Sequence, residues 1–391
     1  MAFNFDSVVE RKGTSCFKWD YAEEIFGESE ILPMWVADMD FKSPVEVIKA
    51  IEDRAKHGVF GYTARPDSLY ESVISWLEKR FDWKVEKEWI LFTPGVVPAI
   101  DLAIQAYTNP DDAVIIQPPV YHPFFGAVEN NNRRLIENPL KFEEGKYRID
   151  FDDLENKITN KTKMLILCSP HNPVGRVWNI NELKKLGHFA KDNGIFLISD
   201  EIHADIVYRP YSHTPFLNAD AAFEEFSIVC MAPSKTFNLA GLETSFVVIK
   251  NKSIREEYEK YIKKYSLWMT NIFGIVATEA AYKYGEPWLC GLLNYLDGNI
   301  KYIEDFIQQR LPEVEFYKPE GTYLAWLDFR KLGLSNKGLK EFLIQKGKVG
   351  LNNGHDFGKE GEGFQRLNFG CPRSLLKDGL ERIEKAINTL K

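Results

Sequence analysis

The stretch Ser227-Ile-Val-Cys-Met-Ala-Pro-Ser-Lys235 joins an apolar run to a lysine, and Thr-Phe-Asn-Leu-Ala-Gly241 follows it. A short apolar run of this kind is typical of a buried strand, so Lys235 is expected at the end of that strand. Desolvation lowers the pKa of an amine toward reactivity, and lysine forms Schiff bases with carbonyl compounds. A lone Ser-Lys pair is more often a surface feature, so its interpretation depends on the ends of the neighbouring strands.

Short apolar runs alternate with helical patterns through the middle of the chain. The expected strands span residues 89–93, 113–117, 164–168, 195–200, 228–232 and 245–250. The expected helices between them span 97–107, 181–193 and 253–264. This alternation predicts an α/β fold with a largely parallel sheet between helices, and in such sheets ligands bind beyond the carboxyl ends of the strands.

The pattern changes from about Pro287 onward. A long helix (289–310), short strands (314–317 and 323–328) and helices at 339–346 and 375–390 predict a smaller α+β domain. We therefore expect an N-terminal arm (1–45) that contributes to the small domain, a large domain (46–286) and a C-terminal small domain (287–391), with the helix after Ser253 as the link. Ser43-Pro-Val-Glu46 predicts a capping box at a helix start, Gly58 its stop and Gly194 the end of the 181–193 helix.

Composition excludes several classes of protein. The 391 residues carry a net charge of −8 with dispersed lysines, which argues against a nucleic-acid partner. The five cysteines lack paired metal-ligand spacing and argue against a disulfide framework or a zinc ribbon. The N-terminus has neither a basic nor an apolar leader region, and no apolar stretch approaches 18 residues, so we expect a cytoplasmic protein that does not enter a membrane.

Three polar side chains follow neighbouring strands where those strands end. Asn172 follows one strand, Asp200 ends the next, and Lys235 follows the third. The set suits a carbonyl cofactor with an aromatic nitrogen, because lysine can hold the aldehyde, the carboxylate can keep the ring nitrogen protonated and the amide can bind the ring oxygen. Taken singly, Asp200 is equally a helix cap and Asn172-Pro173 a turn.

The spacing of Asn172-Pro-x-Gly, Asp200 and Ser234-Lys235 resembles the fold-type I, class I/II aminotransferase family of pyridoxal 5′-phosphate enzymes, over essentially the whole chain. The resemblance implies a large domain with a seven-stranded sheet, a small domain built from both chain ends, an amino-acid substrate and a homodimer with active sites at its interface. It also implies a set of cofactor contacts: Gly95, Val96 and Val97 at a helix start and Ser234 for the phosphate, Tyr62 for the partner's phosphate, Tyr121 on the ring face, and Asn172, Asp200, His203 and Lys235.

The same resemblance assigns the substrate carboxylate to Arg366, with help from Asn172 and the backbone near Val36. Arginine suits this role because its planar fork binds a carboxylate through two hydrogen bonds; a surface salt bridge is the plainer interpretation. Lys235 would then act as the general base on Cα, and Lys235 or Tyr121 would protonate the leaving sulfur.

Four strings narrow the branch within the family: Pro33-Met-Trp-Val-Ala-Asp-Met-Asp-Phe41, Asp200-Glu-Ile-His-Ala-Asp205, Gly321-Thr-Tyr-Leu-Ala-Trp-Leu-Asp328 and Arg366-Leu-Asn-Phe-Gly-Cys-Pro372. They resemble the C–S lyase branch, which implies cleavage of L-cystathionine or related cysteine S-conjugates into a thiol, pyruvate and ammonia. An aminotransferase on the same scaffold is the alternative, and a non-catalytic cofactor-sensing module is a second one that the complete residue set disfavours.

Two features around the site depart from simple expectation. Glu243 stands eight residues after Lys235, where the family usually carries a phosphate-binding arginine, so we expect its side chain to point away and the cofactor to be held less tightly. His203, with Asp200, Glu201 and Asp205, could suggest a metal site. Alternation along a strand would send neighbouring side chains to opposite faces, so we expect no metal there and a cofactor hydrogen bond for His203.

Overall fold

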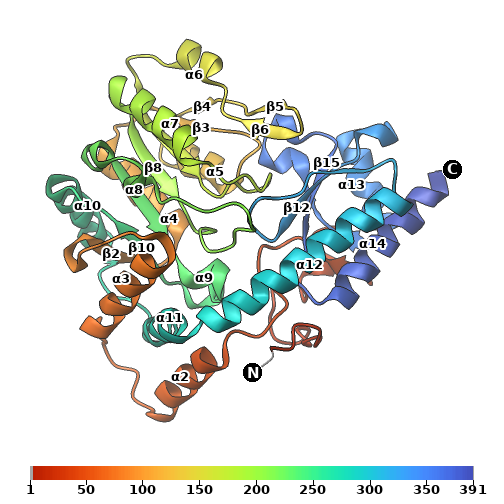
Figure 1. Cartoon of the computed structure of the whole chain (residues 1–391), viewed down its shortest axis with the longest axis horizontal. Coiled ribbons are helices and arrows are strands. Elements are labelled where there is room, and N and C mark those ends of the chain that lie inside the picture. The colour runs from red at the N-terminus through yellow and green to blue at the C-terminus, as the bar shows by residue number, and fades with distance from the viewer. Residues whose placement is uncertain (1–2, 391) are drawn as a thin grey trace.

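A seven-stranded sheet lies at the centre of the computed structural model, which describes residues 3–390 (Figure 1). Its strands, in spatial order, are β2 (Ile90–Thr93), β10 (Ser245–Val248), β9 (Ser227–Met231), β8 (Phe196–Asp200), β7 (Thr162–Cys168), β3 (Ala113–Ile116) and β4 (Arg134–Glu137). Neighbours from β9 to β4 are parallel, whereas β10 is antiparallel to β2 and β9. The expected α/β class and every expected strand of this sheet are confirmed. The sequence prediction missed β4, an edge strand whose side chains are all at least partly exposed.

Both faces of the sheet are buried. Alternate side chains of one strand pack into two different cores, one on each face. Leu165 and Leu167 of β7 belong to the core that also contains helix α7 (Ile180–Asp192). Met164 and Ile166 of the same strand pack into the core formed with α4 (Val96–Tyr107), α5 (Pro123–Asn130) and α10 (Lys252–Lys264). This burial explains why these strands are near-continuous apolar runs.

A second, antiparallel sheet follows the main sheet in the chain. It contains β11 (Glu315–Phe316), β12 (Leu324–Asp328), β15 (Phe364–Asn368) and β14 (Asn352–Asn353), with helices α13 (Asn336–Gln345) and α14 (Arg373–Ile387) nearby. The N-terminal strand β1 (Leu32–Pro33) pairs in parallel with β13 (Val349–Gly350), so both chain ends meet here. This is the expected smaller α+β unit; the domain boundaries themselves stay a prediction.

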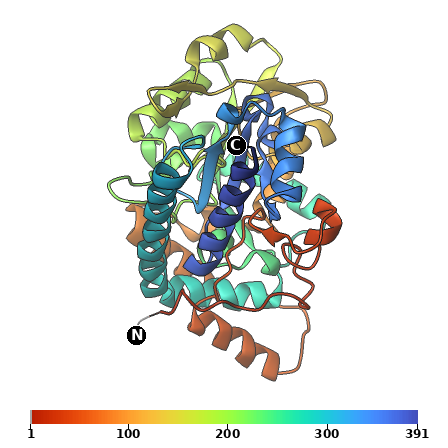
Figure 2. The ribbon, with the colours of Figure 1, turned by 90° about the vertical axis from the view of Figure 1, so that its right-hand side faces the viewer.

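Two local predictions are wrong. The helix after Ser253 was expected to link the two parts of the chain, but this helix, α10, ends at Lys264 on the main sheet. The link is α12 (Glu286–Arg310), which lies beside α14 (Figure 2). Helix α2 (Val45–Lys56) begins without a capping box: Pro44 occupies the cap position, and the Ser43 hydroxyl donates to the backbone oxygen of Asn238 at 3.4 Å. The glycine stops at Gly58 and Gly194 are confirmed, both with positive φ.

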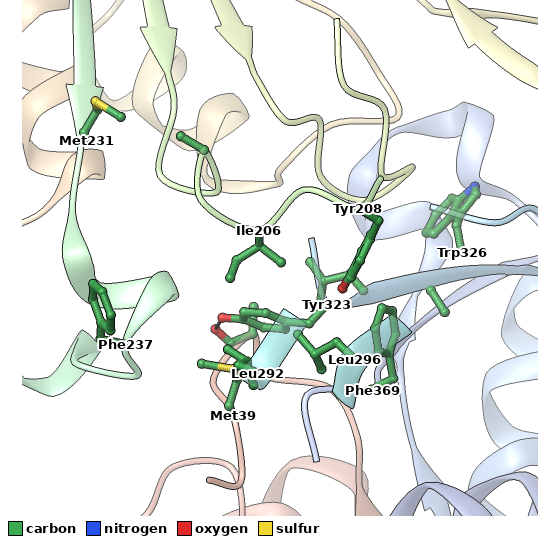
Figure 3. Packing of buried hydrophobic residues seen from close by; sticks show 14 of the residues in the cluster. Met39, Ile206, Tyr208, Met231, Phe237, Leu292, Leu296, Tyr323, Trp326 and Phe369 are labelled. Atoms are coloured by element: carbon green, nitrogen blue, oxygen red, sulfur yellow. Dashed lines mark hydrogen bonds between the residues drawn. The ribbon is translucent and has the colours of Figure 1, made fainter. Parts of the chain in front are cut away.

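Side chains from distant parts of the chain meet in one core between the sheets. Figure 3 shows Met39, Ile206, Tyr208, Tyr323 and Phe369 in this cluster. An isolated bridge between Val207 and Gly321 ties the loop after β8 to the strand region of the second sheet. The loops at the carboxyl ends of the main sheet are therefore packed against the second sheet. No helix within residues 3–390 is both long enough and apolar enough to cross a bilayer.

Candidate active site

The strand ends singled out in the sequence open into one cavity. Strands β7, β8 and β9 are adjacent and parallel, so the segments after them bring Asn172, Asp200 and Lys235 to the same edge. The cavity and its opening to solvent together contain about 790 Å³ of empty space. The predicted site residues that line it are Gly95, Val96, Val97, Tyr121, Asn172, Asp200, His203, Ser234 and Lys235.

Lys235 lies on the short helix α9 (Pro233–Thr236), directly after β9. Its Nζ donates to the backbone oxygen of Ala37 at 2.9 Å. The pKa of Lys235 is lowered to about 8, mainly by desolvation; the positive charge of Arg366 contributes in the same direction, and the negative charges of Asp38 and Asp200 act against it. An amine with this pKa is partly neutral near pH 7, which a nucleophile or a general base requires.

Asp200 is the carboxyl group at the end of β8, and it is almost fully buried. One of its oxygens accepts a hydrogen bond from the backbone N–H of Ile202 at 3.1 Å. Burial raises the pKa of Asp200 to about 7, against the weaker opposing effects of that hydrogen bond and of Lys235. A buried carboxyl in this state favours a cation next to it, because an opposite charge restores its ionised form.

Arg366, on β15, lies outside the lining of the cavity but contacts Asn172, which lines it. Its Nη1 donates to Asn172 Oδ1 at 2.9 Å, and its Nη2 donates to the backbone oxygen of Trp35 and to Asn352 Oδ1. The guanidinium also lies over the ring of Phe357, 4.8 Å from its centroid. Its buried Nε has no hydrogen-bond partner among residues 3–390. An anionic ligand would satisfy this donor, so the arginine is suited to hold a carboxylate.

His203 follows Asp200 in a turn, not in a continuation of the strand. The imidazole is buried, its Nδ1 lacks a partner in the described chain, and burial lowers the pKa of His203 below its ordinary value. It is therefore neutral and can offer one nitrogen to a ligand. Its acidic neighbours have other partners: Glu201 binds His213, and Asp205 binds Arg80. Among residues 3–390 no cluster of metal-ligating side chains is found.

The start of α4 also lines the cavity. Gly95 is its cap residue and no side chain caps the first turn, so the first N–H groups have no side-chain partner. Free N–H groups at the start of a helix favour the binding of a phosphate. The hydroxyl-bearing residues Ser234, Thr244 and Ser245 also line the cavity. Sequence reasoning missed the last two because no motif marks them.

Glu243 is exposed, has a left-handed backbone with φ of 46°, and is one of the residues that line the cavity. Negative charge therefore lies on the border of the pocket that otherwise favours an anion. The expectation that its side chain points away from the phosphate stays a prediction.

The remaining predicted residues have different positions. Tyr121 lines the cavity, and burial raises its pKa, so the phenol stays protonated. Val36 lies outside the lining, and its carbonyl accepts from Asn368 Nδ2 at 2.5 Å. Tyr62 is 97% exposed on the surface of the single chain. Its predicted contact with a partner subunit remains a prediction.

Two side chains that the sequence analysis did not select also shape the site. The Tyr323 hydroxyl donates to Ala37 O at 2.8 Å, the same oxygen that Lys235 contacts. Asn238, three residues after Lys235, donates to the backbone oxygens of Met39 and Phe41. Both lie in or near strings that the sequence marks as family-specific, but neither has a pattern that indicates what it contacts.

These observations fit pyridoxal phosphate. A buried carboxyl group with a raised pKa lies in the cavity, where a protonated ring nitrogen would balance it. The lysine for the aldehyde lies at the end of the next strand, and an uncapped helix start is available for the phosphate. The unpartnered His203 Nδ1 supplies one further polar atom for the ring.

Comparison with known proteins gives a consistent result. The family model for aminotransferase class I and II matches residues 30–383. The chain is 45% identical to the cystathionine β-lyase PatB of Bacillus subtilis, over 98% of this chain and 100% of that protein. Cystalysin of Treponema denticola, whose structure contains pyridoxal 5′-phosphate, aligns with a TM-score of 0.97, 39% identity and full coverage of both chains. The pyridoxal-phosphate-bound C–S lyase of Staphylococcus hominis aligns with a TM-score of 0.92 and 36% identity, over 99% of this chain and 98% of that chain.

Proposed function

The chain belongs to the class I and II aminotransferase family, and we propose that it is a pyridoxal-phosphate-dependent β-lyase. Its substrates are L-cystathionine and related cysteine S-conjugates, which it splits into a thiol, pyruvate and ammonia. The observation that carries the proposal is that Lys235, Asp200 and Asn172 line one cavity and that Arg366 binds Asn172 beside it. The chain also matches a cystathionine β-lyase over its whole length.

Substrate binding is assigned to Arg366 and Asn172. Arg366 is already oriented by Asn172, Trp35 O and the Phe357 ring, and its Nε is available to a carboxylate. A guanidinium held in this way loses little freedom on binding, so it can fix the direction of the substrate's Cα–H bond.

Proton transfer is assigned to Lys235 and Tyr121. Pyridoxal phosphate, when bound, supplies an aromatic ring that accepts the electrons left on Cα. Lys235, neutral in part near pH 7, removes the Cα proton. The Cβ–S bond then breaks, and Lys235 or the protonated Tyr121 phenol gives the sulfur a proton. The Asp200 carboxylate would keep the nitrogen of a bound cofactor ring protonated. The unsaturated amino acid left behind takes up water and yields pyruvate and ammonia.

The test is incubation with L-cystathionine without any keto acid. Release of thiol and pyruvate is expected, and turnover that requires a keto-acid acceptor would favour the aminotransferase alternative instead. The family contains both activities, and no single residue distinguishes them. Lys235→Ala should abolish turnover; full activity in that variant would overturn the assignment of the base.

The proposed assembly is a homodimer with shared sites. Val59, Phe60 and Tyr62 are exposed apolar side chains in one short segment, and exposed apolar groups of this kind are typical of protein interfaces. A partner that covers them would bring its Tyr62 to this chain's cavity. The cytoplasmic location expected from the sequence stays a prediction.

A further inference from the structure

The segment from Trp35 to Phe41 is held by an unusual set of contacts to its backbone oxygens. Most of these oxygens accept a hydrogen bond from a side chain elsewhere in the chain. The donors are Arg366 to Trp35, Asn368 to Val36 and Asp38, Lys235 and Tyr323 to Ala37, and Asn238 to Met39 and Phe41. The segment therefore forms a fixed frame beside the reactive lysine.

We propose that Tyr323 is a positioning residue, which sets both the place and the basicity of the free Lys235 amine through the carbonyl oxygen of Ala37. The inference rests on the proposed function, in which Lys235 takes a proton from the substrate. It concerns a residue outside the set that binds substrate or cofactor.

The geometry supports a shared acceptor. Lys235 Nζ and Tyr323 Oη approach the same oxygen at 2.9 and 2.8 Å, so each uses one of its two lone pairs. Tyr323 is 1% exposed, and burial raises its pKa well above the ordinary value, so the phenol remains a donor. The hydrogen bond to the Ala37 oxygen therefore gives the Lys235 amine a defined resting position, and the Tyr323 hydroxyl shares that oxygen.

The frame keeps this oxygen from moving away. Asn368 Nδ2 binds the carbonyls on both sides of Ala37, those of Val36 and Asp38, at 2.5 and 2.6 Å. Asn238 accepts from the N–H of Met39 at 2.9 Å and donates to its carbonyl at 2.8 Å. Because Asn238 lies three residues after Lys235, the lysine helix and the frame are joined directly.

The hydroxyl disfavours the charged form of the amine. The positive end of the O–H dipole points at the same oxygen as the ammonium, and both donors draw on the same electron density. Without the hydroxyl, the Ala37 oxygen would bind the ammonium more strongly, which favours its charged form. The free amine of Tyr323→Phe should consequently be more basic than that of the wild type.

The experiment compares Tyr323→Phe with Tyr208→Phe. Tyr208 is also a buried tyrosine in the same packed cluster (Figure 3), and its hydroxyl donates to the backbone oxygen of Thr322 at 2.7 Å. Each variant removes one oxygen and one hydrogen bond to a neighbouring carbonyl. Only Tyr323→Phe changes the oxygen that Lys235 contacts, so Tyr208→Phe controls for the general loss of stability.

Two readouts are needed. Competitive labelling of Lys235 by acetic anhydride in the full chain, before cofactor is added, measures the basicity of the amine directly. We expect its midpoint to rise by about half a pH unit or more in Tyr323→Phe, and to stay at the wild-type value in Tyr208→Phe. In the loaded enzyme, the acid limb of the kcat profile should shift in the same direction while KM is unchanged.

An unchanged midpoint in Tyr323→Phe, or an equal shift in both variants, would overturn the inference. Labelling does not require turnover, so its outcome is independent of whether the enzyme splits a carbon–sulfur bond. Failure of the wild type on all β-substituted amino acids would refute the proposed function and leave the labelling result standing.

Discussion

Arg366 Nη1 donates to Asn172 Oδ1 at 2.9 Å, although the two residues lie 194 positions apart in the chain. The contact joins the second sheet to the loop after β7. It also orients the amide, because an oxygen that faces the guanidinium leaves the Asn172 nitrogen on the other side as a donor. In the proposed function, one bond would thus orient both the cation that holds the substrate carboxylate and the donor that faces the cofactor ring.

Asn172→Asp should convert this contact into an ion pair within the protein. The new carboxylate would neutralise Arg366 and compete with the substrate carboxylate for it, so KM should rise and kcat/KM should fall by about 10²-fold. Steady-state kinetics on L-cystathionine measure the change. Asn352→Ala is the matched control, since it removes another oxygen from the same guanidinium without adding charge. Equal losses in the two variants would contradict the explanation.

Asp200→Asn should change how stability depends on pH in the cofactor-free chain. The carboxyl loses its proton near pH 3.8 when unfolded and near pH 7 when folded, so the folded state binds this proton more tightly between those values. The contribution of this group to the free energy of unfolding is at most about 4 kcal/mol. It is fully present below pH 3.8 and is lost as pH rises through 7. Asparagine does not titrate, so the free energy of unfolding of the variant should increase relative to that of the wild type as pH rises.

Urea unfolding at pH 5 and pH 8 measures this difference. Asp152→Asn, at a side chain that is 91% exposed, should follow the wild-type curve. Parallel pH curves for the wild type and Asp200→Asn would show that the Asp200 carboxyl titrates normally.

The fold could be predicted largely from local patterns. The strands around Leu165 and Val229 are buried on both faces and therefore appear as uninterrupted apolar runs, which makes them recognisable. The edge strand β4 was missed because its side chains are partly or fully exposed. The helix start at Val45 was misjudged because a serine before a proline also suits an extended segment, and here Ser43 contacts Asn238.

Site residues could be predicted where the sequence directly around them shows their position at a strand end. Lys235 and Asp200 stand at strand ends, and their positions follow from the parallel order of β8 and β9. The role of Ala37 was not predictable, because a backbone oxygen has no residue signature. Tyr323 and Asn238 were missed for the same reason: each acts on backbone that is far away in the sequence.

Glu243→Arg should strengthen the hold on the cofactor. The residue lines the cavity near the start of α4, so an arginine there could reach a phosphate, whereas the glutamate repels it. We expect the Kd for pyridoxal phosphate to fall by about tenfold. Absorbance titration with the cofactor measures it, and Glu243→Gln, which removes only the charge, should lie between the two. No gain in the arginine variant would show that the side chain does not reach the phosphate.

Mixing two defective chains tests whether the sites are shared. Tyr62 is almost fully exposed in the single chain, so its effect on activity requires a partner's cavity. Lys235→Ala and Tyr62→Ala should each lose most or all activity as separate homodimers. In a mixed dimer, one site combines an intact Lys235 with an intact Tyr62 from the other chain, and the second site lacks both. Since random pairing makes half the dimers mixed, the mixture should recover about a quarter of wild-type activity. An enzyme whose sites are each built from one chain would show no more than the average of its two parents.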